Sequence, residues 1–149
     1  MWQPTELTTQ TRSVKVGHPK GTLFTGTELL VDGTRLSNAI ELVCWDCDPA
    51  QLVICEQCEV MGCHSGDWVS IRRVADHILI LPAFADSLKV GYEFETPPRL
   101  IAQKGSLLLD RSQGADLRRL VPDLPELAEF KPLTAREAVQ LLLFEAPPD

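Results

Sequence analysis

Hydrophobic and polar residues alternate in the first two thirds of the chain in a way that predicts β-strands. Residues 22–31 are rich in threonine and large apolar residues, and Asp32-Gly33 separates them from a second run at 34–36. An Asp-Gly pair between two such runs is a strong signal of a β-hairpin. Residues 67–74 also alternate, and Ala75-Asp76 then returns the chain into residues 77–81. The pattern therefore predicts two antiparallel hairpins.

Shorter strands are expected wherever a brief apolar run lies between turn signals. Such runs occupy residues 39–43, 52–54 and 89–95, and a further hairpin is expected in residues 100–110 around Lys104-Gly105. Residues 1–21 hold few apolar positions, so we expect an irregular arm there, with room for a short strand at 13–16.

The last third of the chain changes to helical spacing. Apolar residues at 117, 120 and 121 predict a short helix over 116–121. Thr134 and Glu137 fit a capping box, which predicts a helix that begins after Thr134 and runs to about Phe144. We expect this helix to pack under the sheet, with a partner or dimer contact as the alternative. Its apolar residues are Ala135, Ala138, Val139, Leu141, Leu142, Leu143 and Phe144.

Together these elements predict an α+β fold with a mostly antiparallel sheet, a cysteine-knuckle insertion and short C-terminal helices. A length of 149 residues is typical of one domain. We divide the expected domain, 1–149, into an arm at 1–21, a β-rich part at 22–110 and a helical part at 111–149. The cysteine segment, 44–64, belongs to the β-rich part.

Composition and charge exclude several classes of function. The chain has 21 acidic and 14 basic residues, for a net charge of −7, and 44% of its residues are hydrophobic. An acidic chain is a poor electrostatic partner for nucleic acid or anionic membranes. No apolar run approaches the roughly 20 residues that span a bilayer, and the first residues lack the features of a signal peptide. We therefore expect a cytoplasmic protein that binds neither nucleic acid nor membrane.

The five cysteines fall within one short segment and follow the pattern C-x2-C-x7-C-x2-C-x4-C, with His64 directly after the last. Tetrahedral zinc takes four ligands, which two C-x-x-C knuckles can supply. The simplest predicted set is Cys44, Cys47, Cys55 and Cys58, with Cys63 or His64 as substitutes for one of them. The spacer between the two knuckles has seven residues, which is shorter than the roughly 12 or more that usually separate the knuckles of a zinc site. We expect the zinc to be structural.

Three other interpretations of the cysteines remain open. The thiols can be small buried hydrophobes without metal. An iron–sulfur cluster also needs four thiolates, but the spacing matches neither common ferredoxin pattern. A redox C-x-x-C pair should open a helix, whereas Asp46 and Asp48 surround the first pair and oppose thiolate formation. His18 and His77 are expected at the surface, and no nucleophile–base pair is evident, so the sequence favours a protein that is not an enzyme.

Residues 52–84 carry a motif in which Cys55, Cys58, Gly62 and Cys63 are followed by an alternating hairpin that ends at Phe84. This motif resembles that of a family of small uncharacterised bacterial proteins with the pattern C-x-x-C-G-x-x-G-C-G. Glu59 and His64 stand where that pattern has glycines. The resemblance implies a bacterial, cytoplasmic, β-rich protein, implies no reaction, and directs attention to the last three cysteines.

The sequence thus leads to a functional hypothesis with two alternatives. Residues 44–70, which include the cysteines, hold five acidic and no basic residues. We expect a non-enzymatic, zinc-stabilised protein-interaction module, adaptor-like or immunity-like, that meets a protein partner through this acidic face or its terminal helix. A homodimer through that helix is also possible. The first alternative is a thiol redox protein or sensor that uses a C-x-x-C pair. The second is a metal-free, β-rich interaction domain.

Overall fold

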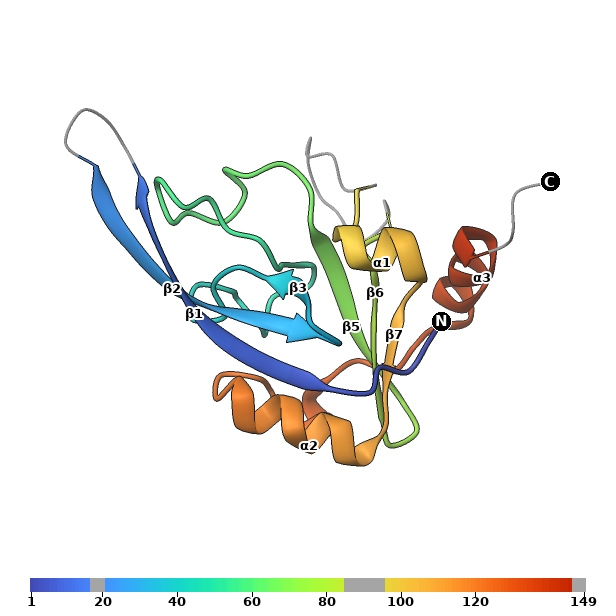
Figure 1. Cartoon of the computed structure of the whole chain (residues 1–149). Helices are drawn as coiled ribbons and strands as arrows, with labels where there is room; N and C mark the ends of the chain where they lie inside the picture. Colours follow the sequence, from blue (N-terminus) through green and yellow to red (C-terminus); the bar gives the residue numbers. More distant parts are fainter. Residues whose placement is uncertain (17–20, 85–95, 146–149) are drawn as a thin grey trace.

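The computed structural model describes residues 1–16, 21–84 and 96–145, which form two antiparallel sheets and three short α-helices (Figure 1). The first sheet has the order β1-β2-β3 and the second the order β4-β5-β6-β7. The strands are β1 (Leu7–Val16), β2 (Thr22–Val31), β3 (Thr34–Ser37), β4 (Ala50–Gln51), β5 (Trp68–Val74), β6 (His77–Pro82) and β7 (Leu107–Leu109). The helices are α1 (Arg99–Lys104), α2 (Arg111–Leu120) and α3 (Ala135–Glu145), with a 3₁₀ turn, η2 (Leu127–Glu129), before α3. The predicted α+β class is confirmed.

Both predicted hairpins are present. The β2–β3 hairpin turns at Asp32 and Gly33, whose φ angles are 49° and 81°. Two consecutive positive φ angles are what a tight turn with the twist of the flanking strands requires. The β5–β6 hairpin pairs Val74 with His77 across the predicted turn.

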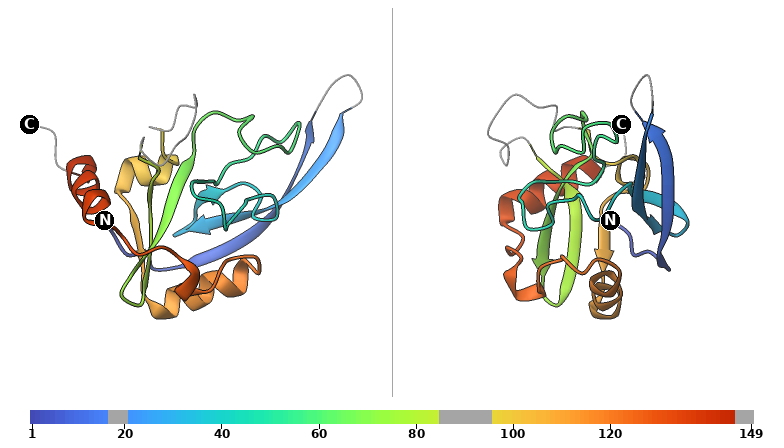
Figure 2. Two further views of the ribbon diagram at one scale, coloured as in Figure 1. Left: turned by 180° about the vertical axis from the view of Figure 1, so that it is seen from behind. Right: turned by 90° about the vertical axis from the view of Figure 1, so that its left-hand side faces the viewer.

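The irregular arm predicted for residues 1–21 is wrong where β1 forms. Leu7 to Val16 pair with Val31 to Thr22 along the whole of β2. The polar residues of β1 are compatible with a strand because its backbone is paired with β2 and its threonines suit a half-exposed ribbon. Figure 2 shows this ribbon along one side of the molecule, with α3 at the opposite end.

Two of the short predicted strands are also wrong, because their apolar residues reflect burial and not strand pairing. Residues 39–43 form turns and residues 52–54 a bend, yet Ile40 and Leu52 are buried in the core. In residues 100–110 a helix, α1, precedes β7 where a hairpin was expected. The strand expected at 89–95 lies outside the described residues, as does His18.

The main hydrophobic core joins both sheets and the first two helices. Strand alternation explains how β6 serves two clusters: Ile78 and Ile80 belong to the main core, whereas Leu79 and Leu81 belong to a second cluster. The second cluster includes Leu141 of α3. α3 therefore covers the outer face of β6.

The expectation that α3 buries its broad apolar surface under the sheet is wrong for most of that surface. Leu141 is its buried residue, whereas Val139, Leu142 and Leu143 are 56%, 72% and 73% exposed. The helix begins as expected after Thr134. The helix is also attached by polar contacts, through Glu137 to Arg72 of β5 and through Glu145 to the N–H of Ser106. The predicted helix over 116–121 also begins earlier, at Arg111, because Asp110 caps it.

Among the described residues, no helix has the length and hydrophobicity needed to cross a bilayer.

Candidate metal centre

The structure separates the five cysteines into two groups, so the predicted four-ligand set is not assembled. Cys44 and Cys47 form a disulfide, with Cα atoms 5.3 Å apart. Cys55, Cys58 and Cys63 are free and form the second group. Cysteines joined in a disulfide have no thiolates to offer a metal ion. In this state Cys44 and Cys47 are therefore not ligands, and Cys63, expected only as a substitute, joins Cys55 and Cys58.

The disulfide lies in a turn that is fixed by its neighbours. The N–H of Cys47 donates to the carbonyl of Cys44 at 3.1 Å, and the buried Trp45 donates its indole N–H to the carbonyl of Ile40 at 2.9 Å. Asp46 Oδ1 lies 3.1 Å from Cys44 Sγ. A carboxylate at this distance disfavours a thiolate at Cys44 once the disulfide is reduced.

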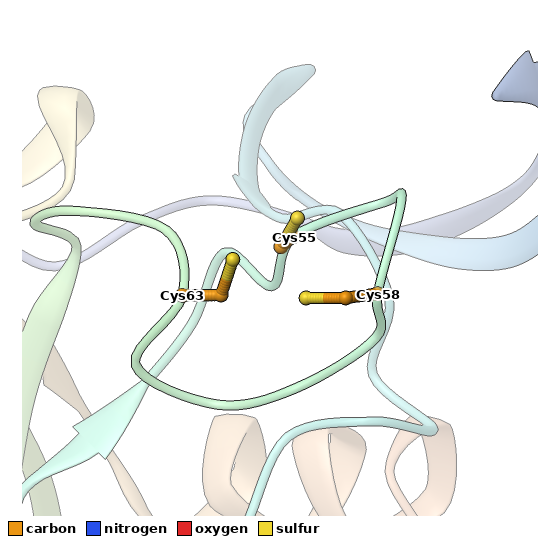
Figure 3. A group of neighbouring side chains, drawn as sticks. All are labelled: Cys55, Cys58 and Cys63. Atoms are coloured by element: carbon orange, nitrogen blue, oxygen red, sulfur yellow. The ribbon is translucent and has the colours of Figure 1, made fainter. Parts of the chain in front are cut away.

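The other three thiols lie in the cysteine loop, residues 52–67, which connects β4 to β5. Figure 3 shows the side chains of Cys55, Cys58 and Cys63 around one small space inside this loop. Their sulfur atoms all lie within 4.8 Å of one another. The Cys55 side chain is half-buried, and those of Cys58 and Cys63 are exposed. This spacing fits three ligands of one metal ion, since Zn–S bonds are about 2.3 Å long.

A buried asparagine holds the first half of the loop. Asn38, which follows β3 and is 1% exposed, donates to the carbonyl of Ile54 and accepts from the N–H of Ile54, both at 2.8 Å. These two bonds resemble a step of a β-ladder, made by a side chain instead of a strand. Because Ile54 immediately precedes Cys55, Asn38 fixes where the first thiol enters the site.

A buried glutamine holds the second half of the loop. Gln51 of β4 is fully buried and donates to the carbonyls of His64 and Gly66 at 2.6 and 2.9 Å. Its carbonyl accepts the N–H of Gly62 at 2.8 Å. The three bonds reach both sides of Cys63 and therefore position the third thiol. Leu52 N–H also donates to Asp67 O at 3.0 Å, which closes the base of the loop.

The loop backbone prepares Cys55 to be ionised. The N–H groups of Cys58 and Gln57, followed by the thiols of Cys58 and Cys63, hydrogen-bond to its sulfur and lower the pKa of Cys55 from 9.0 to about 7. The thiols of Cys58 and Cys55 raise the pKa of Cys63 to about 11. With a pKa of about 7, Cys55 is partly ionised near neutral pH, whereas Cys63 keeps its proton there. Metal binding would release the remaining thiol protons, because the ligands of a metal are thiolates.

His64 lies beside the three thiols without being among them. Its side chain is 38% exposed, and its Nε2 lies 2.6 Å from Oδ2 of Asp67. Its ring nitrogens are not part of the group of atoms within 4.8 Å of one another. The structure thus brings Cys55, Cys58 and Cys63 together and leaves His64 adjacent.

Basic residues from the first sheet face the site. Arg12 of β1 and Arg35 of β3 line one groove together with Cys55, Cys63 and His64. Arg12 also forms an ion pair with Glu56 of the loop. Three thiolates on a divalent ion leave a net charge of −1, which these guanidinium groups would partly offset. Both arginines are also paired with carboxylates, Arg12 with Glu56 and Arg35 with Glu28, so the charges beside the thiols are partly balanced already.

No protein-family model, curated protein or solved structure matches this chain. The resemblance of residues 52–84 to small bacterial proteins stays a prediction.

Sequence reasoning missed Asn38 and Gln51, the two residues that hold the cysteine loop. A single buried amide gives no periodic signal, and its partners are backbone groups that any sequence provides. The one available hint is that both amides lie next to predicted strands, among apolar residues.

Proposed function

We propose that the protein is a non-enzymatic, zinc-binding interaction module whose ion is held by Cys55, Cys58 and Cys63. The observation that carries this proposal is the convergence of three free thiols within 4.8 Å on a loop held by buried side chains. Thiolates are soft ligands that select zinc or similar thiophilic ions over magnesium and calcium. An ion here would link the two halves of the loop directly, in addition to the separate bonds that Asn38 and Gln51 make to them.

The tip of the cysteine loop, residues 59–61, lies between two of the proposed ligands and is suited to contact a protein. Val60 and Met61, between Cys58 and Cys63, are 56% and 43% exposed. Glu59 lies beside them, also exposed. Apolar side chains flanked by acids suit a partner surface that offers an apolar pocket with basic residues around it. Zinc would hold this tip in one conformation and so reduce the entropy lost on binding.

Zinc analysis of single variants tests the metal proposal. We expect about one zinc ion per chain in the wild type, and a large loss of zinc in Cys58→Ser. The double variant Cys44→Ala/Cys47→Ala is the matched control and should retain zinc. Loss of zinc in the double variant would instead support the four-cysteine set predicted from sequence. A wild-type protein that binds no zinc, when purified under reducing conditions, would overturn the proposal.

The interaction role is tested at Val60. The variant Val60→Asp should retain its zinc yet no longer capture, by cross-linking in cells, a protein that the wild type captures. Cys58→Ser should also lose this partner, because the tip is then not fixed. Equal capture by all three proteins would contradict a metal-fixed contact surface.

A thiol redox role at Cys44 and Cys47 is the second candidate. The observation in its favour is the disulfide itself, which lies at a cavity lined by Trp45, Cys47, Arg72 and Phe130. In such a role the disulfide would take two electrons and two protons from a dithiol partner, which becomes a disulfide. Asp46 weighs against it, because a carboxylate beside Cys44 disfavours the thiolate needed for rapid exchange.

Thiol counting distinguishes the two roles of this pair. A redox role predicts five free thiols after mild reduction and three after re-oxidation, with rapid interconversion. A disulfide that forms only on prolonged exposure to air would indicate a reduced cytoplasmic protein, because the cytosol keeps most thiols reduced.

A further inference from the structure

The three-thiol site lacks one ligand for a tetrahedral zinc ion. Structural zinc sites are almost always four-coordinate, with four protein ligands. Cys55, Cys58 and Cys63 supply three. The disulfide removes Cys44 and Cys47 from consideration. The inference below rests on the proposed metal site and concerns the group that completes it.

His64 is the next candidate ligand along the chain. It directly follows Cys63 and lines the same groove as Cys55 and Cys63. One of its ring nitrogens, Nε2, is already taken by Asp67 at 2.6 Å. With the proton on Nε2 and donated to Asp67, the other nitrogen, Nδ1, carries a free lone pair. This is the tautomer in which a histidine binds metal, and a carboxylate behind the ring is the usual partner of a ligating histidine.

Asp67 is itself held in place by the backbone. Gly66 and Asp67 have φ angles of 86° and 63°, which turn the chain sharply before β5. The N–H of Asp67 donates to the carbonyl of Thr96 at 2.9 Å, and its carbonyl accepts the N–H of Leu52 at 3.0 Å. The carboxylate therefore has a fixed base from which to orient the imidazole.

We propose that His64 is the fourth ligand, binding the ion through Nδ1, and that Asp67 is a positioning residue that holds the ring through Nε2. The ring nitrogens of His64 lie outside the 4.8 Å group of sulfur atoms. Ligation through Nδ1 therefore requires the ring to move toward the three sulfur atoms when the ion binds. The chain offers a matched comparison in His77, whose Nδ1 lies 2.8 Å from Oδ1 of Asp76, far along the sequence from the cysteines. If proximity to a carboxylate alone mattered, the two histidines would respond alike.

Zinc affinity of the full chain, measured by competition with a chromophoric chelator, gives the first test. His64→Ala should weaken zinc binding about 10–100-fold or more, and Asp67→Asn about 10-fold. His77→Ala should leave the affinity unchanged. Asparagine is chosen at position 67 because it tolerates a positive φ, and circular dichroism of each variant checks that the fold persists.

A spectroscopic readout separates ligation from a merely structural role. In the wild type labelled with ¹⁵N-histidine, zinc should shift the His64 Nδ1 resonance to that of a metal-bound nitrogen and leave Nε2 protonated, with His77 unmoved. Co²⁺ in place of zinc should give tetrahedral ligand-field bands, which His64→Ala alters and His77→Ala does not.

The outcomes distinguish this inference from the proposed function. If zinc binds to the wild type and is lost in Cys58→Ser, but His64→Ala changes neither affinity nor spectrum, the three-thiol site stands and water or a partner residue is the fourth ligand. That result would overturn the inference alone. If the wild type binds no zinc, both are overturned.

Discussion

Gln51 makes three hydrogen bonds to the backbone of the cysteine loop while its own side chain is fully buried. A buried amide has to satisfy its donors and acceptor inside the protein, since water cannot reach them. The loop carbonyls of His64 and Gly66 and the N–H of Gly62 do this. The hydrogen bonds that satisfy the buried amide of Gln51 therefore also fix the backbone of a loop that has almost no regular secondary structure.

Replacing Gln51 by alanine should destabilise the protein by about 2 kcal/mol, because the loop loses three buried bonds. It should also weaken zinc binding, since Cys63 is no longer positioned. Urea unfolding and zinc competition measure the two effects. Gln57→Ala is the control, because Gln57 is an exposed residue of the same loop. Equal effects of the two substitutions would contradict the role assigned to Gln51.

Arg72 makes a further buried polar contact that sequence reasoning did not anticipate. Its side chain is 7% exposed and lies between Asp48 and Glu137, with Nε 2.8 Å from Glu137 Oε2 and Nη1 3.1 Å from Asp48 Oδ1. Burial alone would raise the pKa of Asp48, but hydrogen bonds and charges from Arg72 and Lys131 outweigh it, so the pKa of Asp48 is lowered.

The lowered pKa of Asp48 makes a prediction about acid stability. A carboxyl with a lower pKa in the folded than in the unfolded state contributes stability above its unfolded pKa of about 3.9. That contribution is lost as the pH falls through the folded value. Asp48→Asn should therefore lower the free energy of unfolding at neutral pH and lose less of it below about pH 4. Urea unfolding from neutral to acidic pH tests this, with Asp123→Asn as control, because Asp123 is an exposed residue. Parallel pH profiles for Asp48→Asn and wild type would refute it.

At the residue scale, the sequence indicated which residue types matter but not how they group. The dense cysteine pattern directed attention to metal-binding chemistry, and the cluster of Cys55, Cys58 and Cys63 is compatible with a metal ion. Division of the cysteines into a disulfide and a separate trio depends on how the chain folds between Cys47 and Cys55, which the spacing of the cysteines does not report. Spacing in sequence is not distance in space.

The helix α3 shows how a local signal can define an element. Thr134 N–H donates to Glu137 Oε1, and Glu137 N–H donates to Thr134 Oγ1, both at 3.1 Å. This is the capping box expected from the sequence. Glu137 has a second task, because its other oxygen accepts the bond from Arg72. The cap therefore fixes both the start of the helix and its attachment to β5.

Thr134→Ala should destabilise the protein by about 1 kcal/mol, the usual cost of losing an N-cap side chain. Thr134→Ser, which keeps the hydroxyl, should cost far less. The midpoint of urea unfolding and the helical signal in circular dichroism measure the effect. If serine costs as much as alanine, the loss arises from the methyl group and the cap contributes little.

Elements with a strong local signal were predictable, and elements defined by their neighbours were not. The Asp32-Gly33 turn, the β5–β6 alternation and the Thr134 cap are all written in consecutive residues. By contrast, β1 is a strand because it pairs with β2. Its polar residues, such as Thr9 and Gln10, give no sequence signal of that pairing. The apolar runs near Ile40 and Leu52 are buried as turns, and burial alone does not distinguish a turn from a strand.

On the scale of the whole molecule, α3 leaves an apolar surface at one end of the protein. Leu142 and Leu143 are more than two thirds exposed, at 72% and 73%, and Val139 lies with them on the same helix. Exposed apolar patches of this kind often mark contact surfaces. The homodimer expected through this helix stays a prediction.

The double variant Leu142→Glu/Leu143→Glu tests it. If the wild type self-associates through α3, sedimentation should show a concentration-dependent dimer that the variant lacks. The melting temperature of the variant monomer should be nearly unchanged, because exposed side chains contribute little to folding. Val74→Glu, an exposed apolar residue of β5, is the control. A wild type that remains monomeric at high concentration would exclude this use of the helix.

The two amides that hold the cysteine loop have one more consequence. Asn38 makes two hydrogen bonds of 2.8 Å, both to the main chain of Ile54. Gln51 bonds to main-chain atoms of residues 62, 64 and 66. Neither amide makes a hydrogen bond to a side chain of the tip, residues 59–61. Residues 60 and 61 can therefore vary under mutation while the frame persists, whereas position 59, with a φ angle of 58°, favours glycine or asparagine. The loop is thus suited to grafting short recognition sequences and to the evolution of new specificities.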